Sequence, residues 1–119
     1  MRYMIIVKAT ASSEAGAKPT DALFTRMAAY HEALSRAGIL VDASGLQSTS
    51  KGWRIEVQGE HRSIVDGPFA EAKEVIAGFA ILDVRSREEA IEHAKRFAKV
   101  IGVERIDVRQ VYEESDFQQ

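Results

Sequence analysis

Two apolar segments constrain the fold of this chain more than any other sequence feature. Residues 3–9 and 75–84 carry apolar side chains at both alternating positions, the first through Val7 and the second apart from Asp83. This pattern is typical of strands that are covered on both faces. Each segment precedes a stretch with the three- and four-residue apolar spacing of an amphipathic helix. We therefore expect these strands to belong to one sheet that is covered by the two helices.

Capping signals locate the ends of both helices. The first helix is predicted over about residues 20–37, because Gly38 suits the left-handed conformation that ends helices. Its apolar stripe consists of Phe24, Met27, His31 and Leu34. The second helix is predicted to begin after Ser86, which can form a capping box with Glu89, and to end at Gly102.

Four weaker patterns complete the predicted sheet. These strand candidates are residues 39–46, 52–58, 62–65 and 103–112. In the second of them, Trp53, Ile55 and Val57 alternate with polar residues, which predicts a half-buried strand that forms a hairpin with the third. With this hairpin set aside, the order of elements is βαββαβ. That order predicts an α+β, ferredoxin-like fold with an antiparallel sheet and both helices on one face.

Length and composition limit the classes of function. A chain of 119 residues predicts one domain over residues 1–119, with a polar tail from 113 to 119. A net charge of −2 gives no electrostatic reason to bind nucleic acid. The absence of cysteine excludes thiol catalysis and thiolate metal sites, and it fits a cytoplasmic protein. No apolar run approaches the ~20 residues of a membrane-spanning helix, and no cofactor or metal motif is present.

The predicted sheet leaves one apolar face without helices. Because monomeric proteins rarely expose such a face, we expect a homodimer in which two sheets pack together as an α/β barrel. The polar positions of the last strand, Arg105, Asp107 and Arg109, would point into or beside this interface. They can form an interfacial ion network, or Arg109, with Asp107 beside it, can bind the anionic group of a substrate.

His31 and Asp66 are the candidates for acid/base chemistry. His31 titrates near neutral pH and points from the first helix toward the sheet, although a histidine in an apolar stripe is more often a packing residue. Asp66 begins an Asp-Gly-Pro turn, which can be purely structural or can hold a carboxylate at the mouth of a pocket. His61 and His93 are expected to be solvated.

Three further features have two interpretations each. Trp53 can stack on a ring-shaped ligand or fill the core, and Phe69 can be a substrate platform or a core residue. Residues 10–18 are small or polar and form either a solvated connector or a lid over a pocket at the end of the first strand. We keep Trp53 and Phe69 as candidate substrate-binding residues.

Several short motifs occur together in one order along the chain. They are the opening residues 1–6, Ala37-Gly38, the run Asp66-Gly67-Pro68-Phe69 with Glu71, Lys73 and Glu74 after it, Gly78-Phe79, Glu89-Ala90 and Val108-Arg109. In this combination the chain resembles the DGPF-domain proteins of the wider YCII-related family. These residues span almost the whole chain. The family pattern usually continues with proline after the Val-Arg pair, whereas this chain has Gln110.

The resemblance implies a ferredoxin-like dimeric α/β barrel from bacteria, in a family whose members mostly lack an assigned function. Some relatives are regarded as enzymes that use a His and Asp pair, and others are associated with sigma factors. Two hypotheses follow. The chain is a homodimeric small-molecule-binding protein, with acid/base catalysis by His31 and Asp66 on an anionic substrate held by Arg109. Alternatively, it is a non-catalytic accessory or regulatory module of stress transcription.

Overall fold

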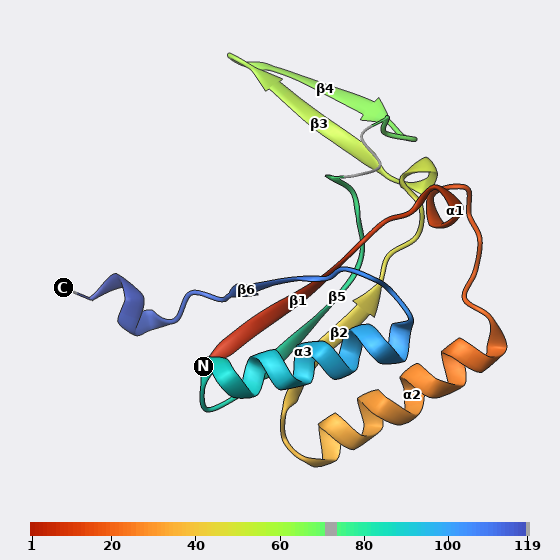
Figure 1. Cartoon of the computed structure of the whole chain (residues 1–119). Helices are drawn as coiled ribbons and strands as arrows, with labels where there is room; N and C mark the ends of the chain where they lie inside the picture. Colours follow the sequence, from red (N-terminus) through yellow and green to blue (C-terminus); the bar gives the residue numbers. More distant parts are fainter. Residues whose placement is uncertain (71–73, 119) are drawn as a thin grey trace.

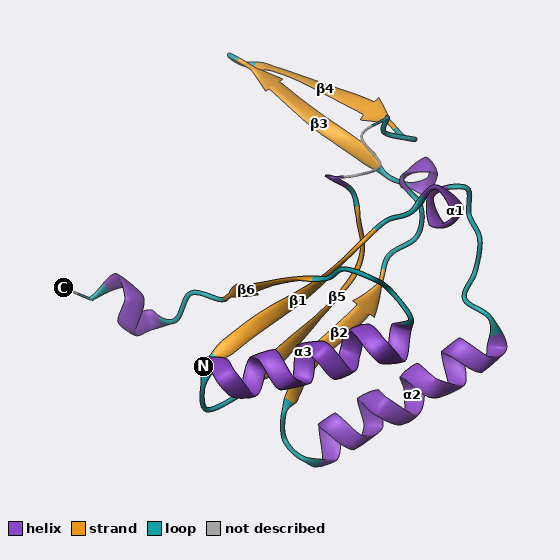
Figure 2. Cartoon of the chain, in the orientation of Figure 1, coloured by secondary structure: helices purple, strands orange, loops and turns teal. Residues whose placement is uncertain are grey.

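A computed structural model describes residues 1–70 and 74–118 of the chain, and it confirms the α+β class (Figures 1 and 2). The strands are β1 (Arg2–Lys8), β2 (Leu40–Gly45), β3 (Trp53–Gln58), β4 (His61–Asp66), β5 (Ile76–Asp83) and β6 (Asp107–Gln110). The helices are α1 (Ala11–Glu14), α2 (Asp21–Arg36) and α3 (Arg87–Ile101), with single 3₁₀ turns η1 (Thr49–Lys51) and η3 (Glu114–Phe117). Strands β2, β5, β1 and β6 form an antiparallel sheet in that order, which is the ferredoxin-like arrangement.

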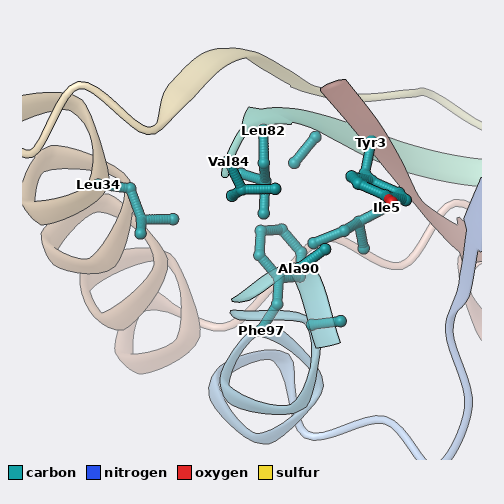
Figure 3. Close-up of a cluster of buried hydrophobic side chains, with 9 residues drawn as sticks. Tyr3, Ile5, Leu34, Leu82, Val84, Ala90 and Phe97 are labelled. Atoms are coloured by element: carbon teal, nitrogen blue, oxygen red, sulfur yellow. The ribbon is translucent and has the colours of Figure 1, made fainter. Parts of the chain in front are cut away.

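The main core lies between this sheet and the two long helices. Ile5 of β1 pairs with Ala80 of β5, and both are fully buried together with Leu82. Phe97 of α3 points into this cluster, and Leu34 closes it from α2 (Figure 3). The two strands with apolar residues at both positions are therefore the central strands of the sheet, as the sequence predicts.

Strand register defines the face of the sheet that the helices leave open. In an antiparallel pair, residues opposite each other point to the same face. The residues that alternate with the core positions on β1 and β5 are Met4, Ile6, Phe79 and Ile81. Asp107 lies opposite Ile6 and Arg109 opposite Met4, so the polar positions of β6 share this open face. Ile6 is buried there although it is not part of the main core cluster.

Strands β3 and β4, which we call the arm (residues 53–66), form a separate two-stranded sheet. Figure 1 shows that the arm projects away from helices α2 and α3. All twelve of its strand residues are exposed, and Trp53 retains 64% of its accessible surface. The expectation that Trp53, Ile55 and Val57 are half-buried is therefore wrong for a single chain. Their alternation indicates that one face needs a cover, and no element of the described chain provides one.

Local hydrogen bonds explain where the observed elements differ from the predicted ones. Residues 10–18 contain the short helix α1, because the Thr10 and Ser13 side chains each accept a hydrogen bond from the other's backbone N–H group. The polar tail contains η3. The ring of Phe117 in η3 packs on the ring of Tyr112, which precedes the tail, with centroids 4.9 Å apart. The last strand begins only at Asp107, after a loop that follows α3.

His93 is buried, which corrects the expectation that it is solvated. It follows Ala90 by three residues and precedes Phe97 by four, so it shares the buried side of α3 with them. The Tyr30 hydroxyl donates to the His93 carbonyl oxygen at 3.3 Å, which ties α2 to α3 at this point. Burial raises the pKa of Tyr30, and the nearby Arg96 partly opposes this rise.

Candidate functional site

A mostly apolar pocket of about 350 Å³ lies between α1, α2 and the end of the sheet where β1 leaves the core. This volume falls in the range of small-molecule sites. Its apolar walls are Val7, Leu23, Met27, Phe97, Ile101 and Val103. Backbone of the glycine-rich ends of β2 and β5 closes one side, where Gly45 and Gly78 lie opposite each other. A methyl group on Gly78 would come within 3.1 Å of the Ser44 carbonyl oxygen, so glycine permits this close approach.

His31 of α2 lines this pocket. Its imidazole stacks on the Phe97 ring, with centroids 5.8 Å apart and an interplanar angle of 28°. Its Nε2 atom is buried and has no hydrogen-bond partner within the described part of the chain. Because an unpaired buried polar atom is unfavourable, this nitrogen is available to a ligand that can donate or accept a hydrogen bond.

Burial lowers the pKa of His31 below its ordinary value of 6.5. The folded protein therefore favours the neutral imidazole near pH 7. A neutral histidine can accept a proton through one nitrogen while it donates a hydrogen bond through the other, which are the two roles of a general acid/base residue.

The lowered pKa of His31 predicts a loss of stability in mild acid. As the pH falls through 6.5, the unfolded chain binds a proton at this position before the folded chain does, so the free energy of unfolding decreases. His31→Gln should show a smaller decrease than the wild type in urea denaturation at about pH 7.5 and about pH 5.5. The difference between the two proteins isolates the contribution of His31 from that of the other histidines. Equal decreases in the free energy of unfolding would therefore contradict a lowered pKa of His31.

Two lysines lie among the pocket residues. Lys8 follows the wall residue Val7, and its Nζ atom lies 3.7 Å from the Asp107 carboxylate. Lys18 lies between α1 and α2, and no ion pair with it occurs among residues 1–70 and 74–118. Because the Lys8 ammonium pairs with Asp107 on the open face, Lys18 is the positive charge that a ligand in the pocket can meet. An apolar interior with this charge beside it suits an apolar molecule with a carboxylate group.

Helix α1 contributes to the pocket and also contacts the root of the arm (Figure 2). The Glu14 carboxylate accepts hydrogen bonds from the backbone N–H of Thr49, at 2.9 Å, and from the Thr49 hydroxyl. The same hydroxyl oxygen accepts a hydrogen bond from the Phe69 N–H at 2.9 Å. This chain of bonds connects residues 10–18, several of which line the pocket, to the turn that follows the arm. The segment is therefore in the position that a lid would occupy.

The six predicted site residues fall into three separate groups. His31 lines the pocket on the helix side of the sheet. Asp107 and Arg109 lie on the open face, so the sheet separates them from His31. Asp66 lies opposite Trp53 at the root of the arm. Trp53 and Phe69 line another cavity there, and the Arg54 guanidinium lies 4.2 Å from the centre of the Phe69 ring.

Asp66 is not among the residues that line the His31 pocket, and a joint role of His31 and Asp66 stays a prediction. Sequence reasoning missed Lys8, Lys18 and Glu14, because no local motif distinguishes them from solvated residues. The available signal for Lys18 and Glu14 was the small, polar composition of residues 10–18. A lid over a pocket is one of the two interpretations of that segment. Glu71 and Lys73, two residues of the resemblance, lie outside the described residues.

Metal-binding clusters and membrane-spanning helices are both absent from residues 1–70 and 74–118. The described residues contain no cluster of three or more histidine, cysteine, aspartate or glutamate side chains that could hold a metal ion. Across the same part of the chain, no helix has both the length and the apolar character needed to cross a bilayer.

Comparison with known proteins identifies one family. The family model described as "YCII-related domain" matches residues 1–113 of the chain. A comparison with curated proteins gives no match.

Proposed function

Because the chain belongs to the YCII-related domain family, we propose that it is a homodimeric protein that binds a small, largely apolar carboxylate in the His31 pocket. The observation that carries this proposal is that His31, whose buried Nε2 atom has no hydrogen-bond partner in the described part of the chain, lines an apolar pocket of about 350 Å³. A ligand that pairs with this atom removes the cost of leaving it unpaired. The apolar walls bind the body of the ligand, and Lys18 binds its carboxylate.

His31 also supports acid/base chemistry in this proposal. Its neutral imidazole can take a proton from a bound molecule or return one to it. Asp66, the predicted catalytic partner of His31, and Arg109, the predicted substrate-binding residue, lie outside this pocket in a single chain. For either residue to take part in catalysis at His31, a second copy or a movement of the arm must bring it to the pocket. The proposal that the protein is an enzyme includes this step.

The homodimer of this proposal forms through the open face of the sheet. That face combines the apolar residues Met4, Ile6, Phe79 and Ile81 with the charged residues Asp107 and Arg109. An apolar centre with a charged margin is the usual composition of a protein interface. Light scattering after size-exclusion chromatography should give twice the mass of 13.2 kDa at micromolar concentration, and a single-chain mass would exclude the dimer.

Thermal-shift measurements with matched ligand pairs test the binding proposal. We expect aliphatic and aromatic monocarboxylates to raise the melting temperature by several degrees at about 100 times Kd, and the corresponding amides to raise it less. Lys18→Gln should reduce the carboxylate effect to that of the amide, because the variant loses the positive charge. His31→Gln should reduce the thermal shifts produced by the carboxylates and by the amides, because it replaces the protein group to which both kinds of ligand form a hydrogen bond.

Lys99→Gln is the matched control, since this exposed residue of α3 lies outside the pocket and the substitution makes the same change in charge. It should leave the ligand effects unchanged. Asp66→Asn adds the test of the predicted acid/base pair, because it weakens binding only if Asp66 enters the occupied site. The binding proposal fails if no carboxylate stabilises the wild type, or if the stabilisation is equal in the wild type, Lys18→Gln and His31→Gln.

A further inference from the structure

The arm has one apolar face that is fully open to solvent in a single chain. Ile55 of β3 lies directly opposite Ile64 of β4, and Trp53 and Val57 occupy the same face as Ile55. These four residues, which we call the apolar arm face, retain from 50% to 69% of their accessible surface. The opposite face carries mostly polar side chains, from Arg54, Glu56, Gln58, His61 and Ser63, with Val65 among them.

Such a hairpin requires a partner. A two-stranded sheet is marginally stable in water by itself, and it usually needs a covered apolar face. Strands β3 and β4 pair only with each other in the described chain. The alternation of apolar and polar residues along both strands therefore points to a cover that lies outside a single copy.

A second copy of this chain fits the surface that is available. From the exposed fractions of its four residues, the apolar arm face offers about 500 Å² per copy, so two arms in a symmetric dimer offer about 1,000 Å². Stable interfaces bury about 1,600 Å² in total, and the open faces of the two sheets can supply the remainder. Both surfaces combine apolar residues with one acidic and one basic residue. Arg62 and Asp66 flank the apolar arm face. Asp107 and Arg109 flank the apolar residues of the open face.

We propose that the arm is a dimer clasp: the apolar arm face of each copy packs against the other copy. This inference rests on the proposed homodimer and identifies a second contact surface for it. The root of the clasp is bonded to the pocket lid, because Glu14 of α1 and Phe69 after the arm both bind Thr49. Seating the arm on the partner thus fixes one end of the lid of its own pocket.

Trp53 allows a direct test, because it is the single tryptophan of the chain and lies on the apolar arm face. In the dimer, its fluorescence should lie at shorter wavelength than that of free tryptophan and should resist acrylamide quenching. Ile64→Asp places a charge on the apolar arm face beside Ile55. We expect this variant to shift from dimer to monomer in light scattering at micromolar concentration, with a several-fold increase in quenching of Trp53.

Ser63→Asp is the matched control, because it introduces the same charge one residue away on the opposite face. It should remain dimeric with a protected Trp53. Circular dichroism and the ligand-induced thermal shift of Ile64→Asp show whether the variant is folded. A variant that stays dimeric and still binds carboxylates would contradict the clasp alone, whereas a wild type that binds no carboxylate would contradict only the binding proposal.

Two results would overturn the clasp. A wild-type dimer with fully quenchable Trp53 would show that the arm lies outside the interface and is available to a different protein, as the accessory-module hypothesis requires. A monomeric wild type with protected Trp53 would show that the arm folds back on its own chain.

Discussion

Phe97→Ala is expected to lower the free energy of unfolding by about 3–5 kcal/mol, the largest effect we predict for a single substitution. The Phe97 side chain is only 3% exposed and reaches the core cluster that contains Leu82 (Figure 3). Its ring also contacts the rings of Tyr30 and His31, at centroid distances of 5.9 Å and 5.8 Å. Removing the ring leaves a cavity and takes away the surface on which His31 stacks.

Phe24→Ala provides the matched comparison for this prediction. Phe24 belongs to the same predicted apolar stripe as His31, yet it is 68% exposed on α2. The same chemical change there should alter stability by less than about 0.5 kcal/mol. Urea denaturation at one fixed protein concentration measures both variants, since the stability of the proposed dimer would depend on concentration. Equal losses at the two positions would contradict the packing that we describe for Phe97.

Gly67→Ala is expected to destabilise the root of the arm by about 1–3 kcal/mol. A methyl group at this position would collide with the carbonyl oxygen of Thr49 and would lie 2.6 Å from its carbonyl carbon. Because these are backbone atoms, the clash cannot be relieved by rotation of a side chain. The turn must move, which weakens the hydrogen bond from the Gly67 N–H to the Gly52 carbonyl oxygen at 3.0 Å.

Gly52→Ala is the control in the same loop. Its backbone is extended, and an added methyl group would lie 3.7 Å from the Thr49 carbonyl oxygen, which is an ordinary contact. We expect Gly52→Ala to leave the urea midpoint nearly unchanged and Gly67→Ala to lower it. If the arm root fixes the pocket lid, Gly67→Ala should also reduce the ligand-induced thermal shift. A variant as stable as Gly52→Ala would contradict the close contact between Gly67 and Thr49.

Two sequence features, the run from Asp66 to Phe69 and the apolar stripe of the first helix, predicted the site only in part. By sequence, the run from Asp66 to Phe69 can be a purely structural turn or can hold a carboxylate at a pocket. In the structure, Gly67 and Phe69 of this run pack against Thr49 at the root of the arm. The periodicity of the first helix places His31 on an apolar side of α2, and in the structure His31 stacks there on Phe97 of α3. The same periodicity includes the exposed Phe24, because a helical stripe is wider than the surface that the sheet covers.

The sequence alone determined the order of the elements, the helix ends and the two central strands. These features depend on local periodicity and on capping groups within a few residues, such as Thr20 before α2 and Gly102 after α3. The tertiary structure alone decided which distant residues meet. His31 and Lys18 share a pocket with Ile101, and Glu14 binds Thr49, because strand order and register bring those segments together. The tertiary structure also revealed that the apolar arm face is uncovered in a single chain, since alternation predicts a buried face but cannot specify what covers it.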